Sequence, residues 1–328
     1  MTWTTLLLRI YAKAHKERNS MKKVGFLGEC MIELSGQAFG KMNQSYGGDT
    51  LNSAIYLNRL QPNLNPYYLT SVGSDSLSEK LVRLWEEEGI NTSSVLVDAQ
   101  HSTGLYQISV DQCGERTFSY WRQNSAASNL MKHPDFRTVA ETIDQLDILY
   151  LSGISIAILP EEDKVALVST LQEAKQKGVT LVFDSNYRSR LWETPEQAQH
   201  WYKQVLPLCS YALITFDDEM LLWGDEELDD AVSRITALGV DKFVLKLGSE
   251  GCVFYEHGNK TLIPTKPIDN VVDTTSAGDS FNAGFLCGIA NGLPYTECCQ
   301  IGNQLAGVVI QYPGAIIPKS QTDKLKRD

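Results

Sequence analysis

The most informative segment of this 328-residue chain reads Asp273-Thr274-Thr275-Ser276-Ala277-Gly278-Asp279-Ser280-Phe281-Asn282-Ala283-Gly284-Phe285. Small residues that can turn tightly come first, and apolar residues then recur at helical spacing from Phe281 to Ile289. The segment therefore predicts a glycine-containing loop that leads into the N-terminus of a helix. Unpaired backbone N–H groups and the helix dipole make such an end suitable for a phosphate.

Asp279 is a carboxylate placed where an anion would bind. One interpretation is structural, an N-cap or first-turn acid, and position alone gives it even weight. The functional interpretation is a general base that takes a proton from a hydroxyl, while neighbouring N–H groups hold the phosphoryl group under attack.

A second motif stands near the start of the chain and reads Gly47-Gly48-Asp49-Thr50-Leu51-Asn52. The paired glycines permit a tight turn, and apolar residues continue from Leu51 as a helix. Asp49 and Asn52 lie three residues apart at its start, so both can face one ligand. An N-cap followed by a polar residue explains the same pattern, and this motif alone favours that plainer interpretation.

Strands and helices alternate along most of the chain. Apolar strands are predicted at residues 24–27, 67–73, 146–151, 179–183, 211–216 and 243–247, with helices after several of them. Near-continuous apolar strands of this kind predict an α/β fold, with a mostly parallel sheet covered by helices on both faces.

A β-hairpin interrupts this alternation. Residues 105–110 and 117–122 read as its strands, joined by a polar turn at 111–115. Strand alternation puts Phe118, Tyr120 and Arg122 on one face, with Tyr106 on the neighbouring strand. An aromatic floor with a guanidinium at its edge suits a small anionic ligand, although a hairpin that packs its aromatic residues on the main domain is the plainer alternative. Residues 35–46 and 104–123 are expected to form a small β lid.

Two more strand ends carry polar residues. Asn186 and Arg188 follow the strand at 179–183 and should project toward the crevice at the carboxyl edge of the sheet. Arg190 is a competing arginine that no strand end positions. The turn from Lys246 to Gly251 is a plain hairpin by itself, and becomes a nucleotide-side loop after a strand end in this fold.

Composition excludes several classes of function. A net charge of -11 and a pI near 5.0 argue against nucleic acid or an anionic membrane as the main partner. No apolar run has the length of a membrane helix. Seven scattered cysteines show no metal-binding spacing and fit a reducing cytoplasm. Residues 1–20 are expected to be an extension that precedes a single domain at 21–328.

Taken together, the motifs at 47–52 and 273–279 resemble the two signatures of the ribokinase-like carbohydrate kinases, in the family's order and at a typical separation. The resemblance covers residues 22–318. Shorter segments are similar to the branch of that family that acts on 2-keto-3-deoxy sugar acids; they lie at 28–34, 104–106, 114–122, 151–155, 186–188 and 314–318.

This resemblance implies a Rossmann-like α/β body with a β lid, a sugar acid beneath the lid, and ATP on the adjacent strand ends with Mg²⁺ bridging its phosphates. It makes Asp279 the base for the substrate's primary hydroxyl, and the N–H groups of Ala277, Gly278 and Asp279 the donors that stabilise developing charge. The implied contacts to the sugar acid come from Gly48, Asp49, Asn52, Tyr106, Tyr120, Arg122, Arg188 and Asp279. The implied contacts to the nucleotide come from Asn186, Arg188, Lys246, Gly248, Gly251, Ala277, Gly278 and Ser280.

The sequence departs from the family pattern at two places. Ser276 stands where many relatives have glycine, and should preserve the backbone N–H. Phe216-Asp217-Asp218-Glu219 stands where many relatives have Asn-x-x-Glu, which leaves Glu219 as the expected metal-side residue. Lid edges in this family often pair between subunits, so a homo-oligomer through the lid is expected.

Three alternatives stand beside the sugar-acid kinase. The first is a kinase of a neutral sugar or nucleoside of the same family. The second is a dinucleotide-dependent oxidoreductase, which fares poorly because no GxGxxG follows the first strand. The third is a non-catalytic sugar-acid binding protein, which would have no need of the base Asp279.

Overall fold

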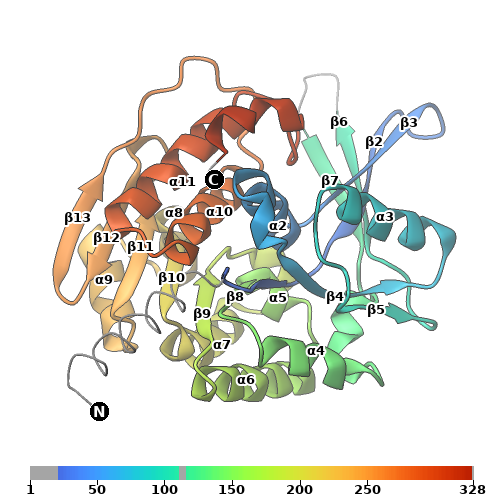
Figure 1. Ribbon diagram of the computed structural model, residues 1–328, viewed down its shortest axis with the longest axis horizontal. Coiled ribbons are helices and arrows are strands. Elements are labelled where there is room, and N and C mark those ends of the chain that lie inside the picture. Colours follow the sequence, from blue (N-terminus) through green and yellow to red (C-terminus); the bar gives the residue numbers. More distant parts are fainter. Residues whose placement is uncertain (1–20, 111–115, 327–328) are drawn as a thin grey trace, which may run out of the picture.

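The computed structural model of the protein describes residues 21–110 and 116–326. Its main sheet has nine strands in the order β13-β12-β11-β10-β9-β8-β1-β4-β5 (Figure 1). In this order, the strands from β11 through β1 to β5 all run parallel to one another. The antiparallel strands β12 and β13 extend the edge next to β11. Its strands are β1 Val24–Leu27, β4 Tyr67–Gly73, β5 Val95–Asp98, β8 Ile148–Ser152, β9 Thr180–Asp184, β10 Tyr211–Thr215, β11 Lys242–Lys246, β12 Cys252–Glu256 and β13 Asn259–Ile263. The predicted, mostly parallel sheet is confirmed.

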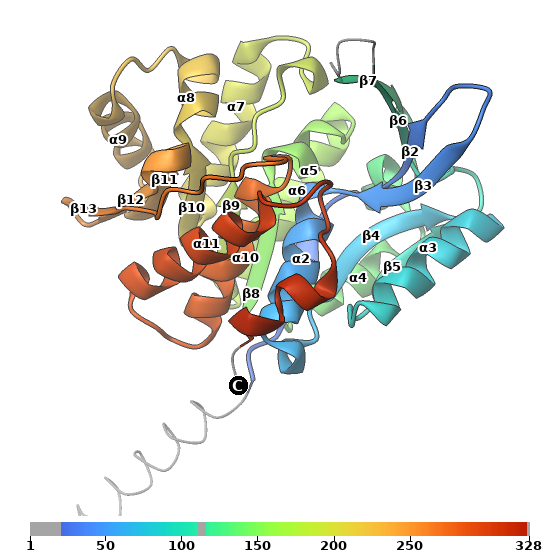
Figure 2. The same ribbon diagram turned by 90° about the horizontal axis from the view of Figure 1, so that it is seen from above.

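Helices cover both faces of this sheet (Figure 2). One face carries α2 Asp49–Leu60, α3 Ser76–Glu87, α10 Ala277–Ala290 and α11 Tyr295–Val309. The other carries α4 Phe136–Ile143, α5 Gly153–Ala157, α6 Glu161–Gln176, α7 Pro195–Val205, α8 Phe216–Trp223 and α9 Leu228–Ala237. Neighbouring residues of one strand enter different cores: Phe26 packs with the first group of helices and Leu27 with the second. Burial on both sides explains why the strands read as continuous apolar runs.

A second, four-stranded sheet extends away from the α/β body, in the order β3-β2-β6-β7 (Figures 1 and 2). Its strands are β2 Met31–Gly36, β3 Met42–Gly47, β6 Leu105–Val110 and β7 Arg116–Trp121. The predicted hairpin strands are therefore present, whereas β2 begins before the expected lid boundary at residue 35. The expected turn at 111–115 and the expected extension at 1–20 lie outside the described residues.

The helices in the described ranges include none that combines enough length with enough apolar character to cross a membrane.

Candidate active site

The first turn of α10 lies at the centre of the site. The helix begins at Ala277, one residue after Ser276, and carries Asp279 in that turn. Its backbone lies close to α11, because a Cβ atom on Gly284 would be only 2.6 Å from the backbone nitrogen of Gly302. This close approach packs the middle of α10 against α11.

Ser280 forms hydrogen bonds within the start of α10. Its side chain is fully buried, and its hydroxyl donates to the carbonyl oxygen of Ser276 at 2.8 Å. Its backbone N–H donates to the same carbonyl at 3.0 Å. Both groups thus already have a partner within the protein, and the expected contact of Ser280 with a nucleotide stays a prediction.

The start of α2 faces the start of α10. Gly48 precedes the helix, and a Cβ atom there would lie 2.2 Å from the carbonyl oxygen of Glu29, so only glycine permits this approach. Asp49 accepts a 2.6 Å hydrogen bond from the amide nitrogen of Asn186, at the end of β9. Burial raises the pKa of the Asp49 carboxyl, in opposition to the hydrogen bonds that it accepts.

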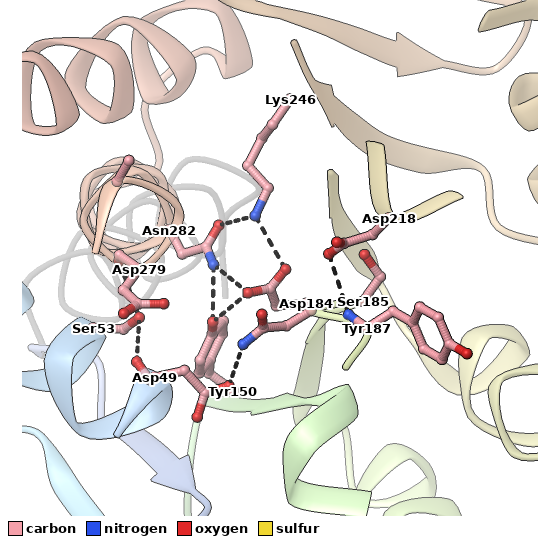
Figure 3. A network of polar contacts seen from close by, with 12 residues as sticks. Asp49, Ser53, Tyr150, Asp184, Ser185, Tyr187, Asp218, Lys246, Asp279 and Asn282 are labelled. Atoms are coloured by element: carbon pink, nitrogen blue, oxygen red, sulfur yellow. Dashed lines mark hydrogen bonds and ion pairs between the residues drawn. The ribbon is translucent and has the colours of Figure 1, made fainter. Parts of the chain in front are cut away.

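Asp279 is the carboxylate best suited to accept a proton. Asn52 Nδ2 and Ser276 Oγ each donate to its Oδ2 at 2.9 Å, and no described residue donates to its Oδ1. Burial, followed by the nearby Asp49 carboxylate, raises the pKa of Asp279 to about 7. Figure 3 shows these two aspartates on facing helices, with Ser53 beside them. At neutral pH a large fraction of Asp279 is thus charged, yet basic enough to take a proton.

A cavity of about 700 Å³ opens between the α/β body and the second sheet. Every residue that the sequence analysis expected to contact the sugar acid lines it: Gly48, Asp49, Asn52, Tyr106, Tyr120, Arg122, Arg188 and Asp279. Tyr106 and Tyr120 are stacked with 5.8 Å between ring centroids and face each other across β6 and β7. Asn186 also lines this cavity. The expected contact of Asn186 with the nucleotide stays a prediction.

Two of the arginines on this cavity are paired with carboxylates. Arg122 forms an ion pair with Glu29, whose side chain is fully buried and also accepts a hydrogen bond from Ser125 at 2.6 Å. Arg188 lies 3.7 Å from the nearest carboxylate oxygen of Asp218, and donates to the carbonyl of Tyr187 at 2.9 Å. Both carboxylate partners are distant in sequence, and the sequence analysis named neither of them.

Arg190, which the sequence left without a position, reaches the same cavity. Its Nη2 donates to the hydroxyl of Tyr120 at 2.9 Å, and its guanidinium carbon lies 4.4 Å from the centroid of that ring. The second sheet holds it, and no pattern within β9 or the following turn predicts such a contact.

A second cavity, of about 480 Å³, lies on the other side of the first turn of α10. Five of the expected nucleotide residues line it, namely Lys246, Gly248, Gly251, Ala277 and Gly278. Asn186, Arg188 and Ser280 are absent from its wall. Thr274 lines this cavity and Thr275 the larger one, so adjacent residues of one loop face different cavities.

A buried polar network holds Lys246 beside α10 (Figure 3). Its Nζ donates to Asp184 Oδ1 at 3.0 Å and to Asn282 Oδ1 at 3.2 Å. Asn282 in turn donates to Asp184 Oδ2 at 2.8 Å and to the Tyr150 hydroxyl at 2.9 Å. A cation next to a helix N-terminus favours an anion there. The sequence analysis assigned no role to Asp184 or Asn282, although Asn282 lies inside the segment 273–285 and Asp184 stands two residues before Asn186.

Glu219, the expected metal-side residue, lines neither of the two cavities. It is buried, and Arg234 Nη2 donates to it at 2.6 Å on the side of α8 that faces α9. Burial raises its pKa to about 7 in spite of that guanidinium. Of the three acids in the first turn of α8, Asp217 is the one that lines the second cavity. The described residues include no cluster of three or more side chains able to cage a metal ion.

Comparison with known proteins gives a consistent result. The model of the pfkB family carbohydrate kinases matches residues 21–323. A 2-dehydro-3-deoxygluconokinase from Haemophilus influenzae is 49% identical over 313 residues, which are 94% of this chain and 99% of that protein. One from Dickeya dadantii is 40% identical, over 90% of this chain and 97% of that protein.

Solved structures agree at the level of the fold. A PfkB protein from Polaromonas sp. JS666 has a TM-score of 0.78 at 24% identity, over 88% of this chain and 96% of that one. A ribokinase II from E. coli in complex with ATP and Mg²⁺ has a TM-score of 0.77 at 20% identity, over 90% of this chain and 94% of that one. Because the family model and the relatives span almost all of the chain, this protein belongs to the pfkB family of carbohydrate kinases.

Proposed function

We propose that the protein is a 2-dehydro-3-deoxygluconokinase, which transfers the γ-phosphoryl group of ATP to the primary hydroxyl of 2-dehydro-3-deoxy-D-gluconate. The product is 2-dehydro-3-deoxy-6-phosphogluconate. The observation that carries this proposal is the pair of cavities that meet at the first turn of α10, with Asp279 on the wall of the larger one. Such an arrangement suits a reaction between two substrates that enter from opposite sides.

Asp279 acts as the general base in this proposal. Its Oδ1, left without a donor by Asn52 and Ser276, takes the proton of the primary hydroxyl. The hydroxyl oxygen then forms a bond to the γ-phosphorus, and the bond from that phosphorus to the bridging β–γ oxygen breaks, releasing ADP. The pKa of about 7 lets the carboxylate accept the proton near neutral pH.

The nucleotide binds in the smaller cavity. Lys246 contributes a positive charge beside the phosphates, and the loop from Gly248 to Gly251 lets the chain approach them closely. The N–H groups of Gly278 and Asp279 donate to the transferred phosphoryl group in this proposal. The N–H group of Ala277 is less available, because it also donates to the carbonyl oxygen of Thr274 at 3.2 Å.

Mg²⁺ fits the donor set of the smaller cavity, because this ion prefers oxygen ligands and keeps several waters when it bridges phosphates. Asp217 is the protein carboxylate that would approach the phosphate-bound ion. When bound, Mg²⁺ neutralises charge on the phosphates.

The sugar acid binds in the larger cavity. Gly48, Asp49 and Asn52 contact its hydroxyls, and the tyrosines with Arg122 and Arg188 surround its acid end. The cationic wall supports an acidic substrate over a neutral one, as do the printed names of the relatives that are 40–49% identical.

The test is ADP formation by the purified protein with ATP and Mg²⁺, offered 2-dehydro-3-deoxygluconate, gluconate, fructose or ribose. We expect turnover with the first substrate alone. Faster turnover of fructose or ribose would replace the sugar-acid assignment by a neutral-sugar kinase, and would leave the family unchanged. Binding of the acid without any turnover would favour a non-catalytic binding protein.

Two further expectations concern the protein's surroundings. The exposed side chains of Phe118 and Trp121 on the edge strand β7 support pairing of the second sheet with a copy of itself. A cytoplasmic location would supply ATP. Light scattering of the purified protein would measure the first, and cell fractionation the second.

A further inference from the structure

Ser276 stands directly behind the base of the proposed reaction. It is the residue that precedes α10, and it is almost completely buried. Its hydroxyl donates to Asp279 Oδ2 at 2.9 Å, three residues further along the chain. Ser276 lines neither the larger nor the smaller cavity, so it can influence the reaction only through its neighbours.

A serine at the start of a helix usually serves the helix itself. Its hydroxyl normally accepts a hydrogen bond from the backbone N–H of the second or third helical residue, here Gly278 or Asp279. Ser276 makes no such capping hydrogen bond, and no described residue accepts from either of these N–H groups. Because the hydroxyl donates to the Asp279 carboxylate instead, both backbone donors stay available for a phosphoryl group.

Two donors from different elements hold the same oxygen of the base. Asn52 Nδ2, on α2, reaches Asp279 Oδ2 at 2.9 Å, and Ser276 Oγ reaches that oxygen at the same distance. Two such hydrogen bonds restrict rotation of the carboxylate and leave Oδ1 for the cavity that Asp279 lines. Glycine, which many relatives have in place of Ser276, carries no side chain that could supply the second donor.

The charged groups around Asp279 come from several elements. Burial raises the pKa of Asp279 most, followed by the Asp49 carboxylate on α2, and Asp184 on β9 adds a smaller increase. The hydrogen bonds from Asn52 and Ser276 lower this pKa. The other titratable or charged groups nearby are Tyr56 on α2, Tyr150 on β8, Lys246 on β11 and the arginines Arg122, Arg188 and Arg190 of the larger cavity. Since the hydroxyl of Ser276 donates to Asp279, its removal leaves all of these groups in place.

We propose that Ser276 is a positioning residue for phosphoryl transfer, which holds Oδ2 of Asp279 together with Asn52 so that Oδ1 faces the substrate's hydroxyl, and which stabilises the ionised carboxylate. The proton passes from the substrate to Oδ1 of Asp279, and the hydroxyl of Ser276 keeps its own proton throughout. The inference rests on the proposed function through the role of Asp279 as the base, whichever sugar is phosphorylated.

The experiment compares pH profiles of Ser276→Ala, Ser276→Cys and wild type, recorded with ATP, Mg²⁺ and 2-dehydro-3-deoxygluconate. In Ser276→Ala the midpoint of the kcat/KM profile should move up by about one pH unit, the effect of losing a hydrogen bond to a charged group. The rate at pH 6 should therefore fall about tenfold, and the difference at pH 9 should shrink to less than about threefold. Ser276→Cys should fall between, because a thiol is a weaker donor. KM for either substrate at pH 9 should change less than about twofold, since Ser276 lines neither cavity.

Ser53→Ala is the matched control. The hydroxyl of Ser53 is also buried beside Asp279, but it donates at 3.0 Å to the backbone carbonyls of Asp49 and Asp279 and not to a carboxylate. The midpoint of this control should stay within about 0.2 pH unit of wild type. If Ser276→Ala leaves the midpoint equally unmoved and lowers the rate by one factor at every pH, the proposal is overturned and Ser276 has only a structural role.

Thermal unfolding gives a second readout that needs no turnover. Loss of a donor to the ionised carboxylate raises the folded pKa of Asp279 further above its ordinary value of 3.8, so stability is lost where the group is charged, above about 7. Ser276→Ala should therefore lower the melting temperature more at pH 8 than at pH 5, where Asp279 is largely protonated in both proteins. An equal loss at both values would again overturn the proposal. If wild type phosphorylates no sugar, the proposed function fails and the positioning role fails with it, whereas an unmoved midpoint in an active enzyme refutes this inference alone.

Discussion

The two walls of the larger cavity are built on opposite electrostatic principles. On the body side, Asp49 and Asp279 are buried near one another, and both carboxyls have raised pKa values. On the side of the second sheet, Arg122 is matched by Glu29, and Arg190 rests on an aromatic ring. Crowded like charges make a group reactive, whereas cations that are paired with a carboxylate or stacked on an aromatic ring make a surface that binds without reacting. The reaction and the recognition can therefore be altered separately.

Asp279→Asn should give the largest effect, because it removes the base and keeps the shape. We expect kcat to fall by about 10²- to 10⁴-fold, the usual contribution of a general base. Substrate binding, measured by calorimetry, should persist, since the carboxamide oxygen can still accept from Asn52 and Ser276. Unchanged turnover would remove Asp279 from the chemistry.

The same variant has a predictable stability. The folded pKa of Asp279 lies above its ordinary value of 3.8, so the fold favours the protonated form, and this contribution is lost as the pH rises through about 7. Asp279→Asn should therefore melt at a higher temperature than wild type at pH 8, with the difference shrinking at pH 5. A lower melting temperature at pH 8 would contradict the assigned pKa.

The pH profile of the wild type should show the next largest effect. Because the base must be ionised, kcat/KM should rise with pH and level off above about 7, falling about tenfold per unit below it. A profile that is flat from pH 5.5 to 8 would show that Asp279 is ionised throughout this range. Its pKa would then not be raised, and the body-side wall would lose the property that distinguishes it from the other wall.

Glu29→Gln should disturb the recognition wall and spare the reaction. The loss of one partner of a buried ion pair costs about 3–5 kcal/mol of stability in typical proteins, and KM for the sugar acid should rise several-fold with kcat little changed. Glu79→Gln is the control, because its pair with Arg83 is about two-thirds exposed and such pairs contribute at most about 1 kcal/mol. Equal melting temperatures for the two variants would mean that the buried pair does not hold the second sheet.

Glu219→Gln should have the smallest effect on activity. Since Glu219 faces Arg234 and not a cavity, the Mg²⁺ concentration for half-maximal rate should change less than about twofold. Asp217→Asn, two residues earlier in the same turn of α8 and on the wall of the smaller cavity, should raise that concentration more. The reverse order would restore Glu219 to the metal site.

The sequence predicted those parts of the molecule that depend on local pattern. Strands buried on both faces read as apolar runs, and the two loop-to-helix motifs carry their own turn and capping residues. The sequence predicted a lid segment at 35–46 but not the separate strands β2 and β3, because side chains from Leu34 to Gln44 are mostly half-buried or exposed and show no clean alternation. The ion pairs of the site could not be predicted from local sequence pattern either. Glu29 and Arg122 are 93 positions apart in numbering (122 − 29), and only the packed second sheet brings them together.

The pair Thr274 and Thr275, adjacent in the chain, divides the two cavities. A single small molecule that tethers a nucleotide to a sugar acid through a short linker could therefore occupy both at once. Binding of its first half would convert capture of the second into an intramolecular event, at an effective concentration in the millimolar range for short flexible linkers. The separation of the cavities by one loop thus makes this protein a suitable target for bisubstrate inhibitors.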